Sequence, residues 1–182
     1  MRKFLLASIV CLTPLWAAGE LSNRRAPGFS IPDGRIQQHD LADYRGKVVV
    51  LEFMQTVCPS CAKLAPILEE VSRKYAGRVQ VLSVVTPPDT TATVGTFIRQ
   101  QGISYPILFD CGQVGGSYWM STPQRPGMDM PHLFLIDQNG YIRNDFGVTP
   151  LTLEIFQGRG LFAEVDRVLA GGDAPPKSSP KK

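Results

Sequence analysis

Two thiols stand only two residues apart in Cys58-Pro59-Ser60-Cys61, a spacing that suits dithiol redox chemistry or metal binding. The pair follows the apolar run 48–54 and precedes a segment with helical periodicity. Cys58 should therefore lie at a helix N-terminus, where its thiolate is favoured and can act as nucleophile and as leaving group. Cys61, one turn further along, would resolve a mixed disulfide formed at Cys58.

A strand and a helix must position this pair. Residues 48–55 form a largely apolar run that is typical of a central strand covered on both faces. Apolar residues then recur at steps of three and four, which predicts a helix over residues 58–76. Pro66 lies within that helix and should kink it rather than end it, because the periodicity continues beyond the proline.

The remainder of the chain alternates strands with helices. An Asp-Gly turn predicts a small N-terminal hairpin over residues 31–36. The periodicity and the turn residues further predict strands at 79–86 and 107–109, helices at 91–101 and 151–169, and a hairpin at 133–146. The last helix should be broken near Gly158 and Gly160. This order of elements predicts an α/β fold, a three-layer α/β/α sandwich.

The two ends of the chain predict export. Residues 1–19 combine a basic start, an apolar stretch and small residues, as in a secretory signal peptide. Residues 20–171 suffice for one domain, and residues 172–182 lack large apolar side chains and should form a disordered tail. We expect an exported, periplasmic protein whose contact with the membrane, if any, is through an uncleaved signal.

The charge and the cysteine content narrow the function. A net charge of +3, without a cluster of lysine or arginine among aromatic residues, indicates no nucleic-acid partner. Outside the predicted signal the chain has three cysteines, so they cannot all pair internally. Cys58 and Cys61 are the expected disulfide, which leaves Cys111 as a buried thiol or as a third participant.

The chain resembles the exported thioredoxin-like proteins of the TlpA and ResA type, within the redoxin and AhpC/TSA group. The resemblance extends from about residue 26 to residue 169 and rests on these motifs: Ala26-Pro-Gly-Phe29, Gly46-Lys-Val-Val-Val-Leu51, Cys58-Pro-Ser-Cys61, and Met130-Pro131 before Leu133-Phe-Leu-Ile-Asp137 and Gly140. It implies a thioredoxin fold with an N-terminal β-hairpin extension and an insertion before the strand that follows a cis-proline.

The resemblance also implies roles for particular residues. Pro131 should follow a cis peptide bond and face the cysteine pair, so that the backbone of Met130 is presented to a bound thiol substrate. Pro59 and Ser60 should complete the substrate-binding surface, although they differ from the Gly-Pro pair of thioredoxin. Glu52 stands where thioredoxins carry a buried acid; burial would raise its pKa and allow it to accept the Cys61 proton. The other reading of Glu52 is an exposed or ion-paired side chain.

Several other residues have competing interpretations. Val57 replaces the tryptophan that many members of the group carry before the first cysteine, which leaves the thiol without an aromatic lid.

The insertion 111–129 is interpreted as a surface loop, with an active-site flap as the alternative. His132 is interpreted as a packed core residue and His39 as a solvated one.

The leading functional prediction is a thiol-disulfide oxidoreductase, most often a reductase in this group. Its partners would be thiols and disulfides of other proteins and an electron donor in the membrane or the periplasm, and no cofactor is expected. A thiol peroxidase is an alternative, although Gln55 stands where peroxiredoxins have threonine. A copper-binding module using Cys58, Cys61 and His132 is another. The residues indicate no particular oligomeric state.

Overall fold

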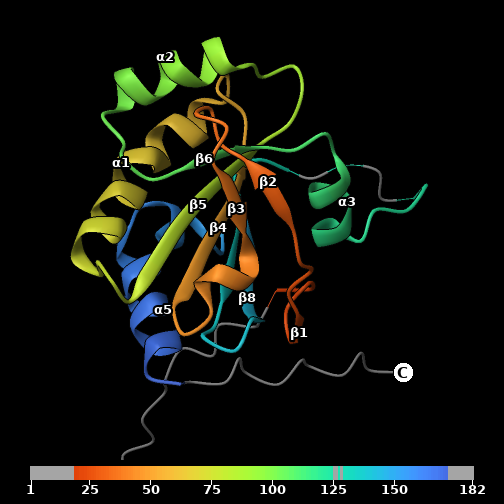
Figure 1. Ribbon diagram of the computed structural model, residues 1–182. Helices are drawn as coiled ribbons and strands as arrows, with labels where there is room; N and C mark the ends of the chain where they lie inside the picture. The colour runs from red at the N-terminus through yellow and green to blue at the C-terminus, as the bar shows by residue number, and fades with distance from the viewer. Residues whose placement is uncertain (1–18, 125–126, 128, 172–182) are drawn as a thin grey trace, which may run out of the picture.

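A six-stranded sheet with helices on both faces forms the centre of the fold (Figure 1). The computed structural model describes residues 19–124, 127 and 129–171. The sheet has the order β1-β8-β7-β4-β5-β6, and β2 and β3 form a separate hairpin. The strands are β1 (Arg24–Arg25), β2 (Ser30–Pro32), β3 (Gln38–Asp40), β4 (Val48–Met54), β5 (Val79–Val85), β6 (Ile107–Phe109), β7 (His132–Ile136) and β8 (Tyr141–Gly147).

Strand β4 lies in the middle of this sheet and carries the cysteine pair at its carboxyl end. It pairs with β5 in parallel and with β7 in the antiparallel direction. All seven of its residues are buried, as expected for a strand that is covered on both faces.

The helices divide the interior into two cores. Helices α1 (Pro59–Lys74), α2 (Thr91–Gln101) and α5 (Arg159–Leu169) contribute to one core, and α3 (Gln113–Trp119) contributes to the other. Figure 1 shows α3 on the side of the sheet opposite α1. The described residues also form the 3₁₀ turn η1 (Leu41–Tyr44) and the short α4 (Leu153–Phe156). The predicted three-layer sandwich is confirmed, with the N-terminal strand pair as an addition.

Helix α1 begins directly after Cys58, which is its N-cap, and Pro59 occupies the first turn. Proline is favoured there because its missing N–H would have no partner in the helix. The helix continues through Pro66, as the periodicity predicts.

The N-terminal hairpin differs from the one that the sequence predicts. The N-terminal hairpin has its second strand at β3 rather than within residues 31–36, because the turn is longer than a two-residue Asp-Gly turn. The Asp33 carboxylate accepts hydrogen bonds from the backbone N–H groups of Arg35 and Gln37, which stabilises this wider turn. Ile36 lies within the turn, is 83% exposed and has a φ of 63°.

The interpretation of the insertion 111–129 as a surface loop is wrong, because part of it is the helix α3. Val114 and Tyr118 of α3 are buried against the sheet. The Tyr118 hydroxyl donates to the Pro27 carbonyl at 3.0 Å, and Arg24 donates to the Tyr118 carbonyl. The helix is therefore fastened to the N-terminal segment.

The last predicted helix is divided, as expected, near one of its two glycines. Gly158 has a φ of 97° and separates α4 from α5, whereas Gly160 lies inside α5. The predicted signal peptide and tail fall outside the described residues, apart from Gly19, and stay predictions. Among the described residues, no helix has the length and apolar character needed to span a bilayer.

Candidate functional site

The sulfur of Cys58 lies at the N-terminus of α1 and contacts two backbone groups. Its Sγ accepts a hydrogen bond from the Cys61 N–H at 3.2 Å and donates to the Met130 carbonyl at 3.7 Å. Cys58 is partly exposed, Cys61 is fully buried, and both are thiols in this structure. An N–H group that points at the sulfur from a helix N-terminus stabilises a thiolate, so this geometry suits Cys58 as the attacking group.

The residues on either side of Cys58 in the sequence are exposed. Val57 is 79% exposed, and Pro59 and Ser60 are exposed as well. These exposed residues form the described surface over which a disulfide in another molecule would approach the sulfur.

Met130 and Pro131 lie beside the cysteine pair although they are about seventy residues away in sequence. The Met130–Pro131 peptide bond is cis, Pro131 is buried, and Met130 is partly exposed. The contact between Cys58 and the Met130 carbonyl shows that this segment borders the reactive sulfur. An extended chain bound at Cys58 would lie next to the Met130 backbone.

Glu52 lies inside the protein behind the cysteine pair, and the reading of it as an exposed side chain is wrong. It is fully buried on β4, directly opposite Ser83 of β5. The Ser83 hydroxyl donates to Glu52 Oε2, whereas Oε1 has no hydrogen-bond partner among the described residues. Burial raises the pKa of Glu52 to about 7, and the hydrogen bond from Ser83 only partly opposes that rise.

The buried Cys61 thiol is difficult to ionise. Burial is the largest cause of its raised pKa, the hydrogen bond with Cys58 adds to it, and so does the negative charge of Glu52. For Cys61 to attack a disulfide, another group would have to accept its proton, and Glu52 is a nearby carboxylate whose charge affects the pKa of Cys61.

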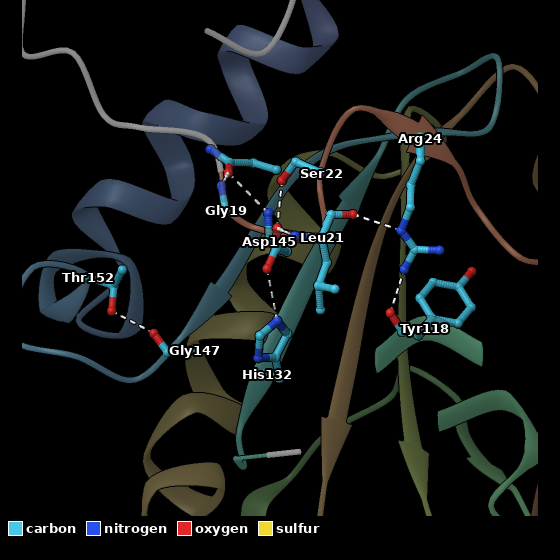
Figure 2. A network of polar contacts seen from close by, with 10 residues as sticks. Gly19, Leu21, Ser22, Arg24, Tyr118, His132, Asp145, Gly147 and Thr152 are labelled. Carbon is cyan, nitrogen blue, oxygen red and sulfur yellow. Dashed lines mark hydrogen bonds and ion pairs between the residues drawn. The ribbon is translucent and has the colours of Figure 1, made fainter. Parts of the chain in front are cut away.

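His132 points away from the cysteine pair, into the core on the α3 side of the sheet. Its ring packs against Trp119 and Phe134, and its Nε2 lies 3.3 Å from Asp145 Oδ2. Figure 2 shows the Asp145 carboxylate between His132 and Ser22, whose hydroxyl donates to Oδ1 at 2.6 Å. His132 is buried, so its interpretation as a core residue is confirmed.

This placement does not favour the copper-binding alternative. Cys61 belongs to the core on the α1 side, and His132 contacts the core on the other side. No group of three metal-ligating side chains occurs in the part of the chain that the structure describes.

Two further residues differ from expectation. His39 is buried rather than solvated, because its Nδ1 lies 2.6 Å from the Tyr44 hydroxyl and its Nε2 lies 3.5 Å from Asp33. Cys111 is exposed rather than buried, and it lies between β6 and α3. Neither residue contacts Cys58 through a hydrogen bond that the structure shows among its described residues.

Ser83 and Tyr105 were not predicted from the sequence. Ser83 is a hydroxyl residue in a strand of mostly valine and leucine, a weak signal of a buried polar partner. Tyr105 precedes β6, is 4% exposed, and its hydroxyl is close enough to Ser83 and Glu52 for both to affect its pKa, which burial raises. Only the register of three strands brings these residues together.

A central sheet with an N-capping cysteine, a second cysteine one turn on and a cis-proline beside them defines a thioredoxin-like protein. Residues 23–145 match the model of the AhpC/TSA family, and the chain belongs to that family.

The comparisons give similar proteins from several bacteria. The chain is 30% identical over 120 residues to the thiol-disulfide oxidoreductase ResA of Bacillus anthracis, a match that covers 65% of each chain. Its structure is similar to that of a candidate thiol:disulfide interchange protein DsbE from Chlorobium tepidum, with a TM-score of 0.63 and 29% identity, over 78% of this chain and 96% of the other. A thioredoxin candidate from Neisseria meningitidis gives a TM-score of 0.65 at 26% identity, over 84% and 95% of the two chains.

Proposed function

We propose that this protein is an exported thiol-disulfide oxidoreductase that reduces disulfides of partner proteins with the Cys58 and Cys61 thiols. The observation that carries the proposal is the position of the Cys58 sulfur, between the Cys61 N–H at the start of α1 and the Met130 carbonyl. The names of the ResA and DsbE relatives support this class of activity.

The reaction begins with attack by the Cys58 thiolate on one sulfur of the partner's disulfide. A bond forms between Cys58 and that sulfur, the partner's other sulfur leaves as a thiolate, and a mixed disulfide results. The helix N-terminus stabilises the attacking thiolate, and the exposed residues around it admit the partner.

The second step releases the partner. Cys61 transfers its proton to the ionised Glu52, and the resulting thiolate attacks the Cys58 sulfur. The Cys58–Cys61 disulfide forms, and the partner's second sulfur leaves as a thiolate. The pair has then lost two electrons and the partner's disulfide has gained them, so a membrane or periplasmic donor must reduce the pair again.

Glu52 is the proton acceptor in this scheme because burial raises its pKa and makes its carboxylate a stronger base. A carboxylate with a pKa of about 7 is ionised above neutral pH and is more basic than an ordinary glutamate. Its charge acts on the Cys61 thiol, whose raised pKa makes a nearby base necessary.

The geometry favours thiol exchange over the peroxidase alternative. A peroxidase needs an arginine and a hydroxyl next to the reactive thiolate, whereas the hydrogen-bond partners of the Cys58 sulfur among the described residues are two backbone groups. The Thr56 hydroxyl donates to Asp89 instead.

The experiment that tests the function is reduction of insulin disulfides by dithiothreitol, with and without the protein. We expect catalysis by the wild-type protein and by Cys111→Ser, the matched control, and none by Cys58→Ser. The reduction potential of the pair, measured against glutathione or dithiothreitol, should be low for a reductase. Equal rates for wild type and Cys58→Ser would refute the proposal, and rapid peroxide consumption with no insulin reduction would favour the peroxidase.

Export has a separate test. The protein expressed with its full sequence in a Gram-negative host should be recovered from the periplasm with a mature chain that starts near Glu20. Recovery of the uncleaved chain from the cytoplasm would contradict export.

A further inference from the structure

A row of buried polar side chains extends from Cys61 toward the far edge of the sheet. Glu52 of β4 lies opposite Ser83 of β5, and Ser83 lies opposite Ile107 of β6. Tyr105 stands two residues before Ile107 and belongs to the same core as Cys61. The row therefore lies beneath α1, on the side of the sheet away from α3.

Two oxygens in this row have no hydrogen-bond partner among the described residues. Glu52 Oε1 and the Tyr105 hydroxyl are both buried and accept or donate no hydrogen bond within the described part of the chain. The hydroxyl is close to Ser83 and to the charge of Glu52. Buried polar atoms without a protein partner are usually hydrogen-bonded to an ordered water, because leaving them unsatisfied is costly. A water bound between these two oxygens would have both of them as polar partners.

Tyr105 also forms part of the wall of a cavity. This cavity has a volume of about 610 Å³ and lies between the β2–β3 hairpin, α2 and the segment that leads into β6. Polar side chains line it too, among them Asp33, His39 and Ser104. Tyr105 therefore belongs both to the core that contains Cys61 and to the wall of this cavity, whose described lining does not include Met130.

We propose that Tyr105 is a positioning residue that, with Ser83, holds a bound water against Glu52 and provides the route by which the Cys61 proton leaves toward this cavity. This route rests on the proposed thiol exchange and adds to it a path for the Cys61 proton. Cys61 gives its proton to Glu52, Glu52 passes it to the water beside Tyr105, and the water releases it into the cavity. Glu52 is then ionised again, and the proton does not return to the substrate side.

Three groups face Glu52, and they influence the pH at which its carboxyl loses its proton. Cys61 faces it from α1, Ser83 faces it from β5, and Tyr105 faces it from the segment before β6. Glu69 of α1 acts on Tyr105, and the Glu69 carboxylate itself is held by Ser104 and Arg73. Removing the Tyr105 hydroxyl should weaken the binding of this water. The ionised form of Glu52 would then be less stabilised.

The test uses 5,5′-dithiobis(2-nitrobenzoate), an aromatic disulfide that releases a coloured thiolate in each of the two steps. The first release reports attack by Cys58, and the second reports resolution by Cys61. Every protein should carry Cys111→Ser, because Cys111 is exposed and would react with the reagent. The rate of each phase is measured from pH 5 to pH 9.

Tyr105→Phe keeps the ring and removes only the hydroxyl. We expect the midpoint of the second phase to rise by about one pH unit, so that resolution at pH 6 slows about tenfold. The first phase should not change. Ser83→Ala should raise the midpoint in the same direction, because it removes the hydrogen bond that lowers the pKa of Glu52.

Tyr75→Phe is the matched control. Tyr75 is buried in the same core, but its hydroxyl lies 3.4 Å from the Phe162 carbonyl rather than near Glu52. The control should leave both phases as in the wild type. An unchanged second phase in Tyr105→Phe, or an equal shift in Tyr75→Phe, would overturn the route alone. Absence of both phases in the Cys111→Ser protein would refute the proposed function itself.

Discussion

Replacing Glu52 by glutamine should change how the stability of the protein depends on pH. The native carboxyl has a pKa of about 7, against a usual value of 4.5 in the unfolded chain. The folded state therefore binds a proton more tightly than the unfolded state does. Its extra stability is fully present below pH 4.5 and is lost as the pH rises through 7. Glutamine cannot titrate, so the variant has no such dependence at this position.

The magnitude follows from the two pKa values. One pKa unit corresponds to about 1.4 kcal/mol, so the complete effect is about 3 kcal/mol, and most of it falls between pH 5 and pH 8. We expect the free energy of unfolding of the wild type to decrease by that amount relative to Glu52→Gln over this interval. The offset between the two proteins at pH 5 does not matter, because the prediction concerns only its change.

Urea unfolding of both proteins at pH 5 and pH 8, with the thiols kept reduced, measures this change. Cys61 contributes little to it, because its raised pKa keeps the native thiol protonated and an unfolded cysteine is mostly protonated at pH 8 as well. Minor surface effects typically change the free energy of unfolding by up to about 0.5 kcal/mol. If the difference in this free energy between the two proteins is the same at pH 5 and pH 8 within that range, Glu52 does not have the raised pKa of a buried carboxyl.

Four other substitutions test further parts of the structure. Cys61→Ser should prevent resolution, so that a covalent adduct between Cys58 and the substrate accumulates in the mass spectrum; release at the wild-type rate would contradict the role of Cys61. Cys111→Ser should change the free energy of unfolding by less than about 0.5 kcal/mol, because the side chain is exposed, and a larger loss on thermal or urea unfolding would show a structural role. Gly102→Ala should destabilise the protein by about 1–2 kcal/mol, because Gly102 has a φ of 65°. Gly95→Ala, inside the same helix, should stabilise it by up to about 1 kcal/mol, and urea unfolding that shows the same sign for both would contradict this.

The sequence predicted those features that depend on local order. Cys58 precedes a periodic apolar segment, and the structure places it as the N-cap of α1. Glu52 stands in a strand of apolar neighbours, and the structure buries it fully. In both cases the residues within one strand or one turn determine the environment of the side chain.

Features that depend on contacts beyond a single strand or turn were missed. The burial of His39 results from its contacts with Tyr44 and Asp33, which a hairpin of different length than expected brings together. Helix α3 contains three glycines or serines among its seven residues, a composition that does not favour a helix. Its packing against the sheet and its bonds to the N-terminal segment stabilise it, and no local pattern shows those contacts.

The two faces of the sheet explain why neighbours in sequence have different relations to the site. Pro131 and His132 are adjacent, yet the segment before Pro131 contacts Cys58 while the His132 ring packs on the α3 side with Phe134 and binds Asp145. Side chains alternate across a strand, so each residue of β7 that faces the α3 core is turned away from Cys61. The polar row under α1 is built instead from one residue on each of several elements. For this reason the candidate proton path could not be found from any single motif, and a test of it must alter Tyr105 and not His132.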